Sequence, residues 1–328
     1  MTQCVHPGLV PKRVLYTGEE VPAIGIGTFG SDRFSAEQVA AAVSGAIRAG
    51  YRLFDCAQVY GNETLIGDVF AKAIADGAVA RQELFIMSKV WNDKHDDALG
   101  ACKQSLRDLR LDALDAYFVH WPFPNYHAPG CDGDSRNPDS VPFSAERFMN
   151  TWRQMERLHE MGLARHIGMS NMTISKLDAV LPACRVKPAM IEMEMHPSFQ
   201  QQALFDYCTT QNILSVGFCP IGSPTRPDRD KAPDDVVDIE MPEIVRIAEA
   251  HGVHPAVVCI KWAVQRGQMP IPFSVVEAQY VENLRCTTED PLTVDEMRAI
   301  AAADRNCRLI KGQVFLWEGA EGWEDLWD

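Results

Sequence analysis

The sequence lacks the cysteine spacing of a disulfide framework or a zinc site. Its ten cysteines are scattered singly, and no C-x-x-C pair occurs. Paired cysteines at such spacing are what a zinc ribbon or a thioredoxin-like site requires. In a chain of 328 residues, isolated cysteines are typical of reduced thiols that pack as small apolar residues. We therefore expect no bound metal and no disulfide framework.

Long hydrophobic runs and an excess of basic residues are also missing. No apolar run approaches the roughly 20 residues that a membrane helix needs, and the first residues, MTQCVHPGLV, do not combine a basic region with an apolar core. The net charge of -14 opposes phosphate backbones and anionic membranes. We expect a cytoplasmic protein that binds neither nucleic acid nor a membrane, as a monomer or a small homo-oligomer.

What the sequence contains is a regular alternation of short apolar runs with segments of helical periodicity. Eight runs predict β-strands, over residues 23–27, 51–55, 84–89, 116–120, 165–170, 189–194, 213–218 and 269–274. This alternation over about 300 residues favours an α/β fold, a closed (β/α)8 TIM barrel, over an open sheet. We predict one barrel domain over residues 1–328. We do not interpret the glycine run GIGTFG, residues 25–30, as a dinucleotide fingerprint.

Features outside the eight repeats are also predicted. The segment RVLYTGEEVPAIGIGTF predicts an N-terminal β-hairpin, and helices are expected to begin at Ser35 and Ser144 and to end at Gly50 and Gly162. Long loops over 121–143 and 219–241 each follow a strand, which places them at the carboxyl-terminal, active-site face of a barrel. The tryptophan-rich tail, residues 309–328, is expected to pack over the barrel mouth.

Four polar residues lie at, or in one case just beyond, the carboxyl ends of the second, third and fourth predicted strands. They are Asp55, Tyr60, Lys89 and His120. Because the carboxyl ends of barrel strands meet at one face, these side chains should converge. A phenol with a pKa near 10 keeps its proton at neutral pH but donates it poorly, and a neighbouring ammonium would lower that pKa. Any one of these residues alone is better explained by packing, capping or solvation, but the ordered set favours a catalytic site.

In this order the sequence resembles the aldo-keto reductase family. The resemblance runs through IGIGTF, FDCAQVYGNE, MSKVW, VHWP, IGMSN, EMHP, CPIGS and VENL, nearly the whole chain. It implies reduction of an aldehyde or ketone by NAD(P)H, with Tyr60 as general acid. Lys89 would stabilise the tyrosinate, Asp55 would keep Lys89 charged, and His120 would orient the substrate carbonyl.

The resemblance also implies which residues hold the cofactor. Ser170 and Asn171 match residues that bind the nicotinamide carboxamide, Glu192 stands where relatives usually have glutamine, and Phe218 matches an aromatic residue that stacks on the ring. Arg226 and Arg229 are expected to lie over the pyrophosphate. The remaining expected cofactor contacts are Thr28, Phe29, Asp55, Pro220, Gly222, Ser223, Phe273, Ser274, Glu277, Gln279, Glu282 and Asn283.

The segment PFSVVEAQYVENL favours NADH, or use of both cofactors. NADPH-preferring relatives commonly place lysine and arginine where this chain has Phe273 and Gln279, and Glu277 adds a negative charge. The additional 2′-phosphate of NADPH would lose two cationic partners. Glu277 could instead accept hydrogen bonds from the ribose hydroxyls of NADH.

The substrate is expected to be a small carbonyl compound in an aromatic pocket. The expected lining residues are Phe29, Trp91, Asn92, Trp121 and Phe123, with Trp317 or Trp323 of the tail closing the pocket. Asn92, Tyr126 and His127 weakly favour a sugar or polyol carbonyl.

Two other functions remain open at this point. A nucleotide-sensing regulatory barrel of the same family would keep the fold with slow or vestigial turnover. A metal-dependent hydrolase would use His120, His196 and Asp55, but the sequence lacks the clustered histidines that such a site needs. We expect His196 to be structural.

Overall fold

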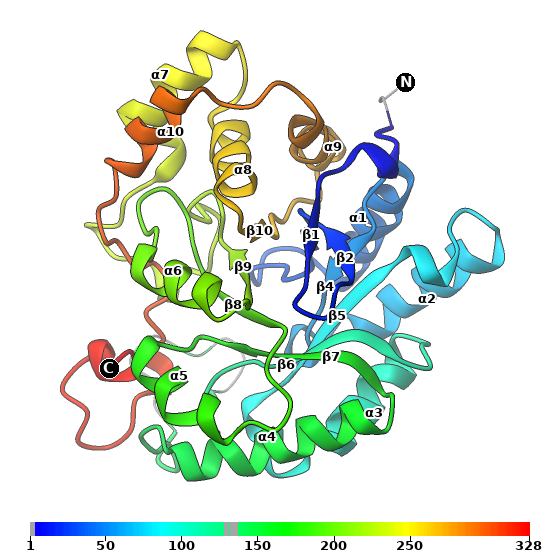
Figure 1. Ribbon diagram of the computed structural model, residues 1–328, viewed down its shortest axis with the longest axis vertical. Helices are drawn as coiled ribbons and strands as arrows, with labels where there is room; N and C mark the ends of the chain where they lie inside the picture. Colours follow the sequence, from blue (N-terminus) through cyan, green and yellow to red (C-terminus); the bar gives the residue numbers. More distant parts are fainter. Residues whose placement is uncertain (1–3, 128–130, 132–136) are drawn as a thin grey trace.

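Eight parallel strands form the centre of the molecule, with helices around them (Figure 1). The computed structural model describes residues 4–127, 131 and 137–328. The barrel strands are β3 Ile26–Gly27, β4 Leu53–Asp55, β5 Phe85–Val90, β6 Leu114–Val119, β7 Ala164–Ser170, β8 Met190–Glu194, β9 Leu214–Phe218 and β10 Met269–Pro270. They follow one another in chain order across the sheet. Backbone hydrogen bonds from Gly25 N to Pro270 O and from Gly27 N to Pro272 O, both 3.0 Å, join the first strand to the last.

All eight predicted strands and the (β/α)8 fold are confirmed. The first and last strands are shorter than predicted, at two residues each. Pro270 and Pro272 have no backbone N–H, so the segment at β10 cannot form a full ladder of hydrogen bonds. The apolar pattern predicts where this strand lies, but it does not predict that the two prolines shorten it.

The glycine run 25–30 does have G-x-G-x-x-G spacing, but it does not open a helix. The next helix begins only at Ala36, after a turn at residues 31–33 and the extended residue Ser35. A Cβ atom on Gly25 would come within 2.2 Å of Leu53 Cδ2, and one on Gly27 within 3.1 Å of Ile271 O. Gly25 therefore leaves room for the Leu53 side chain, and Gly27 permits close approach to the backbone of the last strand segment, rather than forming a phosphate-binding turn.

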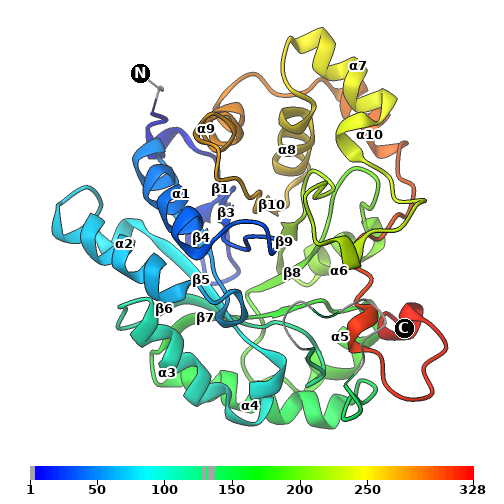
Figure 2. The same cartoon turned by 180° about the vertical axis from the view of Figure 1, so that it is seen from behind.

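The described residues contain ten α-helices, which surround the strands (Figures 1 and 2). They are α1 Ala36–Ala49, α2 Glu63–Ala75, α3 Ala98–Asp108, α4 Ala145–Glu160, α5 Ile174–Val180, α6 Gln202–Thr210, α7 Pro242–His251, α8 Pro255–Arg266, α9 Glu277–Arg285 and α10 Val294–Ala301.

The predicted ends of α1 and α4 are confirmed. Ser35 caps α1 in a capping box with Gln38, and Gly50 ends it in the left-handed conformation at φ 114°. Ser144 caps α4, and Gly162 follows it at φ 73°. A side-chain oxygen at the first position satisfies an otherwise unpaired N–H, and glycine tolerates positive φ without a Cβ clash.

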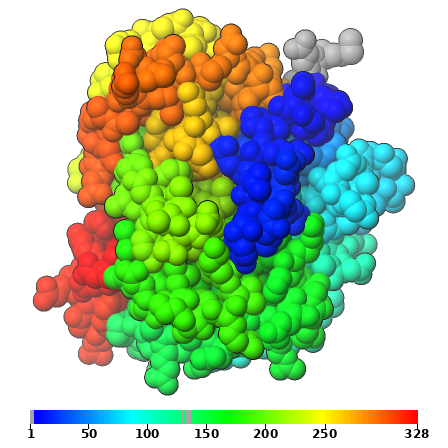
Figure 3. All heavy atoms as spheres, viewed as in Figure 1, coloured from blue at the N-terminus to red at the C-terminus, as the bar shows by residue number. Residues whose placement is uncertain are grey.

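The N-terminal hairpin covers one end of the barrel. Strands β1 Lys12–Val14 and β2 Glu20–Pro22 pair antiparallel, as predicted. Leu15 and Val21 pack with inward-facing residues such as Met87 and Met190. The space-filling view shows the hairpin, in blue, on this face (Figure 3). The closed end leaves the opposite, carboxyl-terminal end for the loops and the tail.

The tail packs back on the barrel, as expected from its tryptophans. Val314, Phe315, Leu316 and Leu326 form an apolar cluster with Trp121 and Phe123. The tail is the red segment beside α5 and α6 in Figure 1. In the part of the chain that the structure describes, no helix is long and apolar enough to cross a membrane.

Candidate active site

A buried ion pair joins the ends of β4 and β5. Lys89 Nζ lies 2.5 Å from Asp55 Oδ1 and donates to Cys56 O at 3.2 Å. A second carboxyl group approaches from β8, with Glu192 Oε1 at 3.4 Å from the same ammonium. Lys89 is wholly buried. Burial lowers its pKa, but Asp55 and Glu192 outweigh burial and raise the pKa well above its ordinary value, so Lys89 stays charged.

Tyr60 and His120 lie next to this ion pair. Tyr60 ends the 3-10 turn η2 Gln58–Tyr60, and its ring centroid is 5.4 Å from Lys89 Nζ. The ring of His120 is edge-on to Tyr60, with centroids 5.8 Å apart. The four residues predicted from the strand ends, which we call the tetrad, are therefore brought together by the barrel.

The charge states of Tyr60 and His120 follow from their surroundings. Burial raises the pKa of Tyr60, and the positive charge of Lys89 opposes this rise without reversing it. Lys89 thus lowers the pKa of Tyr60 as expected, although burial is the larger effect and the pKa stays above its ordinary value. Burial and Lys89 both hold the pKa of His120 well below its ordinary value. At neutral pH Tyr60 is a protonated phenol and His120 a neutral imidazole.

Glu192 is the departure from the expected glutamine, and its surroundings change its chemistry. Burial and the neighbouring Asp55 raise the pKa of Glu192 to about 8, with Lys89 opposing the rise. A protonated carboxyl group has one O–H donor and one carbonyl acceptor. Near neutral pH Glu192 therefore offers the same donor and acceptor types as a glutamine side chain.

The tetrad borders a cavity of about 290 Å³. Of the expected cofactor and substrate residues, twelve outside the tetrad line it: Thr28, Phe29, Trp91, Trp121, His127, Ser170, Asn171, Glu192, Phe218, Ser223, Arg226 and Arg229. Asp55, Tyr60 and His120 line it too, while Lys89 lies behind them. Sequence reasoning missed four lining residues of the tail, which are Ile310, Gly312, Val314 and Phe315.

Some expected pocket residues do not line the cavity. Asn92 is wholly buried and its amide nitrogen donates to Asn125 O, so its side chain supports the loop behind the wall. Phe123 packs behind the wall against Trp121 and Phe315, at ring-centroid distances of 5.7 Å from each. Phe315, rather than Trp317 or Trp323, closes the pocket. His127 lines the cavity as expected, whereas Tyr126 is exposed.

The loop after β9 is fastened by its own arginines. Arg226 pairs with Asp235, and its guanidinium also donates to Asp230 O at 3.0 Å. Arg229 Nη1 lies 2.6 Å from Asp32 Oδ2, on the loop after β3. Both arginines line the cavity, and each also has a carboxylate partner. Their expected position over a pyrophosphate stays a prediction. Pro220 and Gly222, in the same loop, are buried and do not line the cavity.

The expected adenine-end residues form a separate group around the start of α9, outside the cavity lining. Ser274 Oγ donates to Gln279 Oε1 at 2.7 Å, and Glu282 pairs with Arg285. Glu277 and Gln279 are exposed, Asn283 is buried, and Phe273 packs against Phe34 with ring centroids 5.8 Å apart.

The cavity has unused polar atoms that fit a nicotinamide carboxamide. Among the residues that the structure describes, Asn171 Oδ1, Glu192 Oε2 and His120 Nδ1 are buried without a hydrogen-bond partner. Buried polar atoms are normally paired, so such a group of orphans points to a ligand. Asn171 is held in place by donating from Nδ2 to His120 O at 2.9 Å. The three residues that carry these unpaired atoms all line the cavity.

No comparable arrangement for a metal is found in residues 4–127, 131 and 137–328, where no group of three or more His, Cys, Asp or Glu side chains could hold an ion. The fold and the site thus define a (β/α)8-barrel oxidoreductase with an Asp, Tyr, Lys and His tetrad.

Comparison with known proteins identifies the family. The sequence model of the Aldo/keto reductase family matches residues 23–305. The chain is 38% identical over 305 residues to aldo-keto reductase family 1 member A1 of Xenopus tropicalis, covering 92% of this chain and 91% of the relative. It is 38% identical over 317 residues to the aldo/keto reductase slr0942 of Synechocystis, covering 96% and 95% of the two chains. The bovine family 1 member A1 is 37% identical over 304 residues, covering 90% of each chain.

The chain belongs to the aldo/keto reductase family. Membership implies an NAD(P)H-dependent oxidoreductase that acts on small carbonyl substrates.

Proposed function

We propose that this protein reduces an aldehyde or ketone to the corresponding alcohol, with Tyr60 as the general acid. The observation that carries the proposal is the meeting of Tyr60, His120 and the Lys89–Asp55 ion pair at one wall of the cavity. Each member supplies one requirement of carbonyl reduction: a proton, an orienting hydrogen bond and a positive charge beside the proton donor.

The residues act together on the carbonyl oxygen. When bound, the nicotinamide cofactor supplies a hydride to the carbonyl carbon. As negative charge develops on the oxygen, Tyr60 transfers its phenolic proton there and the alcohol forms. The Lys89 ammonium stabilises the resulting tyrosinate, which is the same interaction that opposes the raised pKa of Tyr60. His120, held neutral, presents a ring nitrogen to the same oxygen and fixes its orientation.

Ser170, Asn171 and Glu192 would hold the carboxamide of the cofactor. The unpaired Asn171 Oδ1 accepts from the amide nitrogen, and a protonated Glu192 can donate to the amide oxygen. Phe218 offers an apolar face to the ring. This arrangement would let a glutamic acid take the part of a glutamine near neutral pH.

NADH, or either cofactor, is the preferred assignment. Phe273 and Gln279 supply no cation to a 2′-phosphate, and Gln279 is engaged by Ser274. Glu277 is exposed beside them at the first turn of α9. Like charge beside a phosphate is unfavourable, which supports weaker binding of NADPH.

The substrate class is an aldehyde or ketone with an apolar or partly hydroxylated body. Trp91, Trp121 and Phe315 form the aromatic wall, with Trp121 and Phe315 centroids 4.7 Å apart. Aromatic faces bind both aromatic carbonyls and the apolar faces of sugars. Asn92 lies behind the wall, whereas His127, in the loop after β6, places a polar side chain at the cavity.

Product analysis tests this function directly. The purified protein is incubated with NADH or NADPH and a panel of aromatic aldehydes, ketones and open-chain sugars. We expect oxidation of the cofactor matched one to one by alcohol formed. Cofactor binding without alcohol from any carbonyl would contradict the proposal and favour a nucleotide-sensing barrel.

A further inference from the structure

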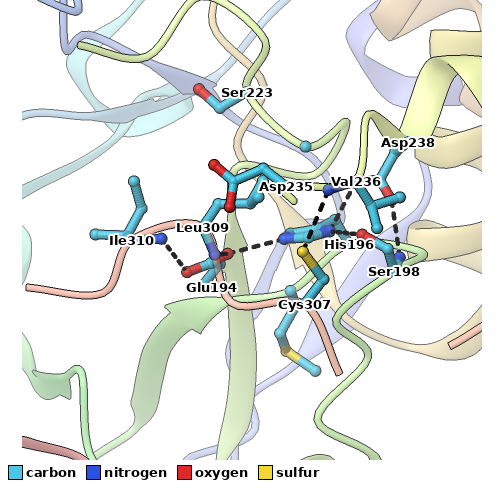
Figure 4. A network of polar contacts seen from close by, with 12 residues as sticks. Glu194, His196, Ser198, Ser223, Asp235, Val236, Asp238, Cys307, Leu309 and Ile310 are labelled. Carbon is cyan, nitrogen blue, oxygen red and sulfur yellow. Dashed lines mark hydrogen bonds and ion pairs between the residues drawn. The ribbon is translucent and has the colours of Figure 1, made fainter. Parts of the chain in front are cut away.

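A second group of buried charged residues lies at the carboxyl end of β8 and in the loop after β9, outside the cavity lining (Figure 4). His196 Nε2 is 2.9 Å from Glu194 Oε1, and His196 Nδ1 is 2.7 Å from Asp238 Oδ2. All three side chains are 0–1% exposed. Burying three ionisable side chains costs stability unless each is paired. The contacts of His196 with Glu194 and Asp238 provide that pairing.

Glu194 fastens the C-terminal tail. Its carboxylate accepts backbone N–H groups from Leu309 at 2.7 Å and from Ile310 at 2.9 Å. Hydrogen bonds to an ionised carboxylate are stronger than neutral ones. One anchored residue, Ile310, lines the cavity itself, and the following residues Gly312, Val314 and Phe315 also line it.

Asp238 fastens the loop after β9. It begins the 3-10 turn η7 Asp238–Glu240, and its Oδ1 accepts the backbone N–H of Ser198 at 2.8 Å. Gly222 packs directly on it, because a Cβ atom at Gly222 would come within 2.4 Å of Asp238 Oδ2. The next residue, Ser223, lines the cavity, as do Arg226 and Arg229 farther along this loop.

The two anchored segments are also joined to each other. Lys311 Nζ lies 3.3 Å from Asp235 Oδ1, and Gln313 Nε2 donates to Arg229 O at 2.6 Å. The loop and the tail are therefore joined to each other above the cavity, and the buried cluster of Glu194, His196 and Asp238 contacts both of them.

We propose that Glu194, His196 and Asp238, which we call the clasp, are positioning residues that hold the two walls of the cavity in register and thereby set its affinity for substrate and cofactor. None of the three side chains lines the cavity, so the clasp acts only through the segments it fastens. The inference rests on the proposed reductase function for its kinetic consequences, but its structural part stands independently.

The geometry assigns a separate effect to each carboxylate. Glu194 holds the tail, whose aromatic residue Phe315 faces the substrate end of the cavity beside Trp91 and Trp121. Asp238 supports the loop that is proposed to cover the cofactor. His196 joins the two and would affect both.

A kinetic experiment separates positioning from general stabilisation. The variants are Glu194→Gln, Asp238→Asn and His196→Asn, and the substrate probe is benzaldehyde. Loss of one charge-assisted hydrogen bond corresponds to about tenfold or more. We expect Glu194→Gln to raise KM for benzaldehyde by about that factor with kcat nearly unchanged, Asp238→Asn to weaken NADH binding comparably, and His196→Asn to do both.

Glu156, on α4, provides a matched control outside the cavity lining. It is also wholly buried, and its carboxylate accepts the backbone N–H groups of Arg185 and Val186 and pairs with the Arg185 side chain. Glu156→Gln should lower the melting temperature while leaving KM and cofactor affinity unchanged. Equal kinetic effects from Glu156→Gln and Glu194→Gln would overturn the proposal.

Hydrogen exchange tests the same assignment without any enzymatic activity. In Glu194→Gln, the amides of Leu309 and Ile310 and those of the following residues through Leu316 should exchange faster, with the barrel strands unaffected. If Glu194→Gln folds poorly, Glu194→Asp keeps the charge but shortens the side chain and should show the same local change. Unchanged exchange over 309–316 would contradict the clasp. A local increase in a protein that forms no alcohol would uphold the clasp and reject the reductase function.

Discussion

Glu192 Oε1 lies 3.4 Å from Lys89 Nζ, so the buried lysine of the tetrad is paired with two carboxyl groups rather than with Asp55 alone. This pairing places a titratable group where the amide of a glutamine was expected. The charge of the active site therefore changes with pH as Glu192 gains or loses its proton.

The first prediction concerns Glu192→Gln. The raised pKa means that the folded protein holds a proton on Glu192 up to about pH 8, whereas the unfolded chain releases it near pH 4.5. Stability from this group is therefore present below about pH 4.5 and is lost as pH rises toward 8. We expect the variant to be more stable than the parent at pH 9 by at least about 1 kcal/mol, and similar at pH 5. Denaturant titrations at both pH values measure this.

The same substitution tests the proposed contact with the cofactor. In the parent protein, NADH affinity should fall as pH rises through about 8, because ionised Glu192 has no proton to donate. In Glu192→Gln the affinity should stay constant over this range. A parent protein whose NADH affinity is flat from pH 6 to pH 10 would show that Glu192 does not donate to the cofactor.

The second prediction concerns Lys89→Met. Removing the ammonium leaves Asp55 buried beside Glu192 without its cation, which should cost about 3–5 kcal/mol of unfolding free energy. Adding Asp55→Asn should recover part of the stability but none of the activity, because the charge beside Tyr60 is still missing. Recovery of both in the double variant would show that Lys89 is only structural.

The third prediction concerns the pH stability of the clasp. Burial lowers the pKa of His196, but Asp238 and Glu194 outweigh burial and raise it to about 9. Arg308, near Glu194, and Ser198, 3.1 Å from His196 Nδ1, also face the group. A raised histidine pKa contributes stability below about pH 6.5 that is lost as pH rises through about 9. The loss should approach roughly 3 kcal/mol in the parent protein.

In His196→Asn this loss between pH 6.5 and pH 9 should disappear, although the variant is less stable at neutral pH. Chemical denaturation across that range, on the parent and the variant, measures the difference. Parallel stability curves for the two proteins would mean that His196 is not charged when folded.

The fourth prediction concerns cofactor choice. Phe273→Lys with Gln279→Arg supplies two cations near the expected 2′-phosphate, and each charge-assisted contact corresponds to about tenfold in affinity. NADPH should bind at least about tenfold more tightly to the double variant, with a steeper salt dependence, and NADH should bind almost as before. If the parent protein already prefers NADPH, other cations fill this role and the NADH assignment is wrong.

The arrangement of the tetrad could be predicted because parallel strands deliver their carboxyl ends to one face of a barrel. Asp55, Lys89 and His120 each lie at or directly after a strand, so the strand pattern fixed their neighbourhood. Residues in the irregular loops could not be placed in this way. Asn92 turns inward to Asn125, and Arg226 turns to Asp235, because loop paths depend on contacts that periodicity does not encode.

The tail illustrates the same limit. Its tryptophans indicated that it packs on the barrel, but Phe315 faces the cavity and Trp327 packs beside Trp121 instead. The anchoring of the tail by Glu194 depends on backbone N–H groups, which are the same for every residue type except proline. No pattern of side chains could have revealed that contact.

The most direct test of the account is the turnover of Tyr60→Phe with benzaldehyde and NADH, measured beside Tyr117→Phe. Tyr117 is a buried tyrosine on β6 whose hydroxyl makes no hydrogen bond among the described residues, so its loss should leave kcat within about twofold. Tyr60→Phe should bind NADH normally and lose at least about a hundredfold in kcat, because the proton donor is gone. A Tyr60→Phe enzyme that keeps its full kcat would contradict the proposed role of Tyr60.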